Sequence, residues 1–160
     1  MQQLKWWWKM TRVDFYHLQK TSLEQVLPKL CEKAYATEKR IKILIDNEER
    51  VDFINSLLWT YSDEAFLPHG CKKDGFVEKQ PIFISCDIEN ENDAKILILA
   101  DGARPSVDFL QNFERVLNIF DGSNETALDL ARNYWKQIKN IDCELHYWQQ
   151  NDNGSFEQKV

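Results

Sequence analysis

Residues Leu57 to Gly70 read Leu-Leu-Trp-Thr-Tyr-Ser-Asp-Glu-Ala-Phe-Leu-Pro-His-Gly, and the rest of the chain is organised around them. Their apolar residues follow neither a helical nor a strand period. Leu57, Leu58 and Trp59 end a helix, whereas Phe66 and Leu67 lie in the connection to the next strand. Pro68 and Gly70 then stop the segment and turn it. The stretch therefore predicts a junction between a helix and a strand.

This link carries large apolar side chains, although linkers are usually polar. The side chains are those of Trp59, Tyr61, Phe66 and Leu67. They must be buried under the sheet or exposed to a partner. We interpret the three leucines of the stretch as core. For Trp59 and Phe66 both interpretations stay open, since the polar residues 62–64 between them suggest an apolar patch with a polar rim.

The composition is that of one globular domain. The chain has 160 residues, of which 43% are hydrophobic and 29% charged, which is enough for one core and too short for two comfortable ones. Its net charge of −6 argues against binding nucleic acid with the whole surface, because phosphate affinity rests on clustered Lys and Arg. Any contact with DNA is therefore expected to be local or indirect.

The cysteines indicate neither a metal centre nor a disulfide framework. The 4 Cys residues form no Cys-x-x-Cys pair and lie in different predicted elements. We therefore expect a reduced, cytoplasmic protein without a structural metal or cofactor.

Residues 1–9 contain Trp6-Trp7-Trp8 between two lysines. This run is too short to span a bilayer and lacks the features of a signal peptide. We predict a disordered N-terminal extension. The alternative is a contact of the Trp cluster with a membrane surface or a partner.

Apolar runs predict strands at 13–18, 41–45, 81–85, 95–99, 115–120 and 144–149. A first helix is predicted to open with a capping box of Thr21 and Glu24, and a second to be capped by Asp46 and to end near Leu58. Residues 107–113 are expected to be irregular or helical, 124–140 to form the last helix, and 151–160 to be a polar tail. This alternation predicts a single-domain α/β fold, Rossmann-like, with a mostly parallel or mixed sheet and helices on both faces.

Two aspartates give an enzymatic alternative. Asp46 and Asp101 are expected at the carboxyl ends of strands, where α/β sheets bind ligands, and could hold Mg²⁺ for phosphoryl transfer. However, Asp46 is explained as a helix cap, Asp101 begins an Asp-Gly turn, and the chain has no glycine-rich phosphate loop. A metal-dependent enzyme or a nucleotide-binding domain thus remains the alternative function.

Cys71 is a candidate nucleophile, because it is followed by two lysines and lies close to His69 in sequence. Nothing in the sequence supplies an orienting third group or an oxyanion hole. We therefore interpret Cys71 as an exposed structural thiol.

The last helix has two distinct faces. Its predicted core stripe consists of Ala127, Leu130, Ala131, Tyr134 and Ile138. A second face carries Arg132, Trp135, Lys136 and Lys139. This face is either a solvated surface whose charges pair with Glu125 and Asp129, or a dock for a short acidic and apolar peptide. His146 or Trp148 on the adjoining strand is expected to complete the pocket.

Several short motifs, in the right order from Met10 to about Gln150, resemble the chi subunit of bacterial DNA polymerase III. They are Phe15-Tyr16-His17-Leu18, Leu57-Leu58-Trp59, Phe66-Leu67-Pro68-His69-Gly70 and Glu144-Leu145-His146-Tyr147-Trp148-Gln149-Gln150. No single motif is a catalytic fingerprint, but together they are specific. The resemblance implies one chi-like domain over residues 10–150.

The resemblance also implies a function, which is that of a non-catalytic accessory subunit of the polymerase III holoenzyme. Such subunits link the clamp loader, through the psi subunit, to the acidic C-terminal tail of single-stranded-DNA-binding protein. The resemblance places the tail site on Arg132, Trp135 and Lys136, and we expect Trp59 and Phe66 to bind psi. One turn earlier, where the family often has another basic residue, this chain has Leu128 and Asp129. We expect a monomer or a heterodimer with psi, without a membrane contact.

Overall fold

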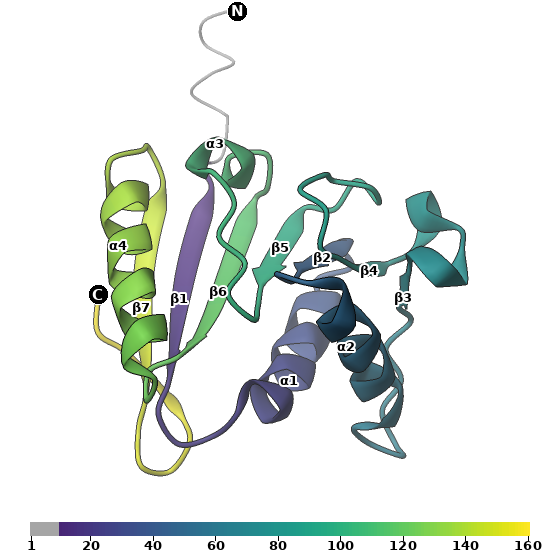
Figure 1. Ribbon diagram of the computed structural model, residues 1–160, viewed down its shortest axis with the longest axis horizontal. Helices are drawn as coiled ribbons and strands as arrows, with labels where there is room; N and C mark the ends of the chain where they lie inside the picture. The colour runs from purple at the N-terminus through teal and green to yellow at the C-terminus, as the bar shows by residue number, and fades with distance from the viewer. Residues whose placement is uncertain (1–9) are drawn as a thin grey trace, which may run out of the picture.

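The computed structural model describes residues 10–160 (Figure 1), and the predictions for residues 1–9 lie outside this range. Its centre is one eight-stranded sheet in the order β3-β4-β2-β5-β6-β1-β7-β8. The strands are β1 Arg12–Leu18, β2 Ile41–Leu44, β3 Gly70–Cys71, β4 Ile82–Ser85, β5 Ile96–Leu99, β6 Arg115–Asp121, β7 Glu144–Gln150 and β8 Phe156–Gln158. All neighbouring strands pair in parallel except β7 and β8. The predicted mixed α/β sheet is confirmed.

Helices cover both faces of this sheet. They are α1 Leu23–Tyr35, α2 Glu48–Thr60, α3 Val107–Leu110 and α4 Glu125–Lys139, and two short 3-10 helices, η2 Lys72–Asp74 and η3 Val77–Lys79, follow β3. One core packs α1 and α2 against alternate residues of the strands, such as Leu117. The other core packs α3 and α4 against the intervening residues, such as Val116. Successive strand side chains point to opposite faces, so β1, β2, β5 and β6 contribute to both cores.

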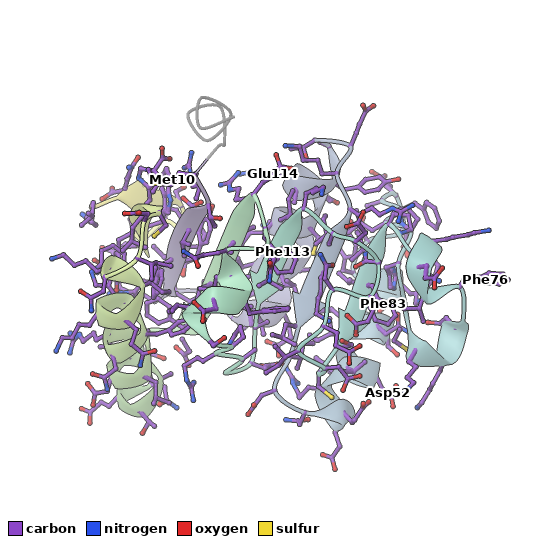
Figure 2. All side chains as sticks on the ribbon, turned by 90° about the horizontal axis from the view of Figure 1, so that it is seen from above. Met10, Asp52, Phe76, Phe83, Phe113 and Glu114 are labelled. Atoms are coloured by element: carbon purple, nitrogen blue, oxygen red, sulfur yellow. The ribbon has the colours of Figure 1, made fainter. Side chains whose placement is uncertain are left out.

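The aromatic side chains divide between core and surface. Phe83 and Phe113 are buried against the sheet, whereas Phe76 projects from the outer end of the molecule (Figure 2) and is 78% exposed. Phe76 also adopts a left-handed backbone conformation, with φ of 52°. No helix within residues 10–160 has the length and apolar character needed to cross a membrane.

Both predicted helix starts are displaced by one residue. In α1 the side-chain oxygen of Gln25 accepts the backbone N–H of Ser22 at 3.0 Å, so the capping box does not use Thr21 and Glu24. In α2 the cap is Asn47, whose side chain accepts the Arg50 N–H at 3.0 Å, and not Asp46. Ser, Asp, Asn and Thr are all good caps, so adjacent candidates compete closely.

Residues 151–160, predicted only as a polar tail, contain the last strand. β8 pairs antiparallel with β7, and the Phe156 ring meets Tyr16 edge-on with centroids 5.1 Å apart. The carbonyl oxygen of the Gln150 side chain accepts backbone N–H groups of residues 19, 20 and 21. This buried amide ties the end of β7 to the loop between β1 and α1.

Candidate protein-docking sites

The first candidate site is the outer flank of α4, which we call the Trp135 face and define as Arg132, Trp135, Lys136 and Lys139. The three basic residues are exposed, and Trp135 is half-buried. The helix turns these residues to one side because they recur at i, i+3, i+4 and i+7. The structure thus brings all four predicted residues of the helix together.

An aromatic bed supports the indole of Trp135. The ring meets Phe15 edge-on at a centroid distance of 5.2 Å and Tyr147 at 5.5 Å. Phe120 lies 6.2 Å from both Phe15 and Tyr147, again edge-on. Edge-to-face packing of this kind fixes ring orientation. Trp135 therefore presents the exposed part of its indole as a rigid apolar wall.

A buried histidine completes the bed below Tyr147. His17 Nδ1 lies 2.6 Å from the Tyr147 hydroxyl oxygen. A Cβ on Gly122 would lie 1.8 Å from His17 Nε2 and 2.9 Å from the Leu18 carbonyl oxygen, so only glycine fits beside this ring. Burial lowers the pKa of His17, and the positive charge of Arg132 lowers it further. The charge of Arg132 therefore acts on the bed below it.

The cations of the Trp135 face are mostly free for a ligand. Arg132 makes one ion pair, at 3.8 Å to Asp129, and both side chains are well exposed. An exposed pair of this kind contributes little stability. Within residues 10–160, Lys136 and Lys139 form no ion pair, and Glu125 does not pair with the face as the solvated interpretation expected. Carboxylates from a partner could therefore be accepted without breaking a strong internal contact.

His146 and Trp148 do not complete this pocket, and that expectation is wrong. Both side chains lie on the opposite face of the sheet. His146 contacts Glu144 at 2.9 Å and Gln158 at 2.8 Å. The Trp148 indole N–H donates to Asp14 at 2.9 Å. Leu145 and Tyr147, which alternate with His146 and Trp148 along β7, face α4. The residue beside Trp135 is therefore Tyr147.

The sequence contained the signal that identifies Tyr147. In a strand, every second residue shares a face, and Leu145 is an apolar residue suited to packing under a helix. Leu145 and Tyr147 both pack against the core beneath α4. Applying the strand period to β7 would have placed Tyr147 beside the helix.

The second candidate site is the patch of Trp59 and Phe66, which we call the Trp59–Phe66 patch. Trp59 is 50% exposed and Phe66 is 70% exposed. Their ring centroids lie 5.9 Å apart. Leu58 and Leu67 are buried, and Leu57 packs against the same core, as predicted for the three leucines. The segment therefore packs its leucines against the core and exposes Trp59 and Phe66.

His69 underlies the Trp59–Phe66 patch. Its Nδ1 lies 2.6 Å from the Leu67 carbonyl oxygen and its Nε2 lies 2.9 Å from the Asn55 carbonyl oxygen. Carbonyl oxygens only accept hydrogen bonds, so the imidazole can act only as the donor toward them. The buried imidazole thereby joins the C-terminal part of α2 to the link.

Of the two residues of the enzymatic alternative, Asp101 is engaged in an ion pair and Asp46 is exposed. Asp101 accepts a hydrogen bond from Arg50 Nε at 2.7 Å, and Arg50 also pairs with Glu24 at 2.8 Å. Asp46 is exposed and forms no ion pair within residues 10–160. No cluster of three or more His, Cys, Asp or Glu side chains suited to a metal ion occurs in that range. Asp101 is therefore a structural ion-pair partner.

Cys71 is buried, contrary to the expected exposed thiol. Burial raises the pKa of this thiol, which disfavours the nucleophilic thiolate. The backbone N–H of Cys71 donates to the Asp74 carboxylate at 2.9 Å, which fixes the turn after β3. Its role in the described structure is packing.

Comparison with known proteins points in one direction. The family model described as "DNA polymerase III chi subunit, HolC" matches residues 10–146. "Probable DNA polymerase III subunit chi" of Rickettsia prowazekii is 31% identical over 142 residues, which cover 84% of this chain and 86% of that protein. "DNA polymerase III subunit chi" of Pseudomonas aeruginosa is 27% identical over 134 residues, covering 80% of this chain and 92% of that protein.

Proposed function

The chain belongs to the DNA polymerase III chi-subunit family, and we propose that it acts as a non-catalytic adaptor within the polymerase holoenzyme. In this proposal the Trp135 face binds the acidic C-terminal tail of single-stranded-DNA-binding protein. The Trp59–Phe66 patch binds a psi-like subunit of the clamp loader. The protein works in the cytoplasm and meets DNA only indirectly, through its partners.

The Trp135 face is the observation that carries this proposal. It places exposed cations around a rigid aromatic wall on a protein whose net charge is −6. Its two properties match a peptide that is both acidic and apolar, because guanidinium and ammonium groups bind carboxylates and the indole packs against a side chain. The absence of a basic residue at Leu128 and Asp129 leaves fewer cations than the family pattern has.

The Trp59–Phe66 patch supports a second partner. Its rings are exposed, whereas most other large apolar side chains of residues 10–160 are buried, apart from a few single residues such as Phe53 and Phe76. Aromatic rings with a polar rim are typical of the centre of a protein interface. The patch and the Trp135 face come from different elements, α2 with its following link and α4, so one subunit could hold both partners.

Isothermal titration with a peptide from the tail of the host single-stranded-DNA-binding protein tests the proposal. Wild-type protein should bind with a dissociation constant on the order of micromolar, since a short tail must be ordered on binding. The Arg132→Glu, Lys136→Glu double variant should lose binding because like charges replace opposite ones. Added salt should weaken wild-type binding only in part, because the indole contact is not screened.

A matched control makes the charge reversal informative. Lys29 and Lys33 are exposed on α1, which covers the opposite face of the sheet. The Lys29→Glu, Lys33→Glu variant changes the net charge by the same amount and should bind the peptide like wild type. Equal affinity of wild type and the α4 variant would place the tail site elsewhere.

A further inference from the structure

A cavity of about 650 Å³ lies at the carboxyl ends of β1, β5 and β6. The loop after β1 leads to α1 on one face of the sheet, and the loop after β6 leads to α4 on the other face (Figure 1). Such a point, where neighbouring connections diverge, is where open α/β sheets bind ligands. Neither the Trp135 face nor the Trp59–Phe66 patch uses this cavity.

The cavity contains a buried amide that has no hydrogen-bond partner in the described part of the chain. Asn118, on β6, lines it and is only 6% exposed. Within residues 10–160 the Asn118 side chain makes no hydrogen bond. Its amide is not completely enclosed by protein. The small accessible part of Asn118 lies in the wall of the cavity. A buried amide without a protein partner points to a ligand or to water that would satisfy it.

The carboxylates and the cations around the cavity differ in their ion-pair and hydrogen-bond partners. Glu24 and Asp101 share the Arg50 guanidinium at 2.8 Å and 2.7 Å. Asp121 accepts the backbone N–H of Ser123 at 2.9 Å. These carboxylates are held in place, with oxygen atoms left over for further hydrogen bonds.

The two cations of the lining are not engaged. Among residues 10–160, the side chains of Lys20 and Arg104 form neither an ion pair nor a hydrogen bond with another side chain. Cations without internal partners at the rim of a cavity suit an anionic group on a ligand. The apolar wall is formed by Leu130, Ala127 and Ala131 of α4.

We propose that this cavity binds a nucleotide. The Asn118 amide offers a donor next to an acceptor, which matches the edge of a purine base such as adenine. The fixed carboxylates of Asp101 and Asp121 suit ribose hydroxyl groups, as acidic residues do in related folds. Lys20 and Arg104 then neutralise the phosphate groups. The volume accommodates a ligand of this size.

This site and the proposed tail site use different flanks of α4, although Phe120 lines the cavity and also belongs to the aromatic bed under Trp135. The cavity is lined by the flank of the helix that carries Ala127, Leu130 and Ala131. Trp135 contacts Phe15 and Tyr147 on the other flank. Variants can therefore be chosen that disturb one site and leave the other intact.

Isothermal titration of the full chain with ADP tests the proposal, with adenosine and inorganic phosphate as partial ligands. ADP should bind saturably, and each partial ligand should bind more weakly. Asn118→Leu should weaken ADP binding about tenfold, because the paired hydrogen bonds to the base are lost. Arg104→Ala should weaken ADP binding several-fold and adenosine binding hardly at all. Arg104 is exposed, so this variant keeps the test valid if Asn118→Leu fails to fold.

The control is the Arg132→Glu, Lys136→Glu variant, which should bind ADP like wild type. Conversely, Arg104→Ala should bind the tail peptide like wild type. The proposal is overturned if ADP shows no saturation up to about 1 mM, a weak limit for a specific site. It is also overturned if Arg104→Ala binds ADP unchanged, or if phosphate alone binds as tightly as ADP. These outcomes leave the tail-binding result untouched.

Discussion

The indole of Trp59 lies against the imidazole of His69, with ring centroids 4.3 Å apart and planes tilted by 42°. His69 is buried, while Trp59 is half exposed. Because both nitrogens of His69 meet carbonyl oxygens of the main chain, its ring cannot turn without losing a hydrogen bond. The exposed indole is therefore held by a fixed group beneath it.

Replacing both rings of the patch tests its role as an interface. The Trp59→Ala, Phe66→Ala variant should remain a folded monomer and lose binding to the psi-like partner, since aromatic anchors commonly contribute about 2 kcal/mol or more. Size-exclusion chromatography with the partner and circular dichroism measure both properties. Phe76→Ala, at an equally exposed ring on another segment, should bind normally. An unfolded double variant would show that the rings belong to the core.

Removing the His69 side chain should destabilise the fold. His69→Ala removes the contacts of the two ring nitrogens with the Leu67 and Asn55 carbonyl oxygens, which is expected to cost about 1–3 kcal/mol of unfolding free energy. Urea denaturation measures this loss. His146→Ala is the matched control, because that histidine contacts only the side chains of Glu144 and Gln158 near the surface. Equal stability of the two variants would contradict the bridging role of His69.

The pKa of His17 should report on the Trp135 face. Burial lowers this pKa, Arg132 lowers it further, and Asp121 raises it. Arg132→Ala removes one of the lowering charges, so the pKa of His17 should rise in that variant. An acidic peptide bound at Arg132 should raise it as well. NMR titration of the imidazole signals measures the change. An unchanged pKa of His17 in Arg132→Ala would show that the charge of Arg132 does not act on His17.

The lowered pKa of His17 also determines whether stability rises or falls with pH. Because the folded protein holds His17 with a lowered pKa, the unfolded chain binds more protons between the folded and unfolded values. The contribution of His17 to stability is therefore complete above the ordinary histidine pKa of about 6.5 and is lost as the pH falls toward the folded value. His17→Gln should flatten this part of the stability profile.

Asp46 and Asp101 form a matched pair for testing the enzymatic alternative. Asp101→Asn weakens the contact with Arg50 and should lower the unfolding free energy by about 1 kcal/mol. Asp46→Asn should change it by less than about 0.5 kcal/mol, because Asp46 is exposed. Thermal denaturation measures both. A divalent-metal-dependent phosphatase or nuclease activity that either substitution abolishes would overturn the adaptor proposal.

The sequence predicted the strands and helices that have strong local patterns. The apolar runs at 13–18 and 41–45 and the stripe of α4 are visible without any knowledge of neighbours. Local signals were weaker where candidates compete, as between Asp46 and Asn47 at the start of α2. The difference between two adjacent caps is smaller than the effect of the surrounding packing.

Features that depend on distant partners were missed. β8 has three residues and a single apolar side chain, Phe156, so only its pairing with β7 identifies it. The cavity at the ends of β1, β5 and β6 likewise joins segments far apart in the chain. Asn118, inside an otherwise apolar strand, was the one sequence signal for it, because a polar residue there needs a partner.

The two edges of the sheet have a consequence for solubility. β3 has two residues and β8 has three, so neither edge offers a long row of unpaired backbone groups. Long, flat edges invite other chains to add strands and polymerise. β8 pairs with Trp148 to Gln150 of β7, and residues 159 and 160 bond to Tyr147. If residues 151–160 were deleted, this part of β7 would also lose its partners, the whole seven-residue strand would become an edge, and the truncated protein would be prone to self-pairing. Residues 151–160 therefore protect the sheet from edge-to-edge aggregation. An affinity tag should be added after these residues and should not replace them.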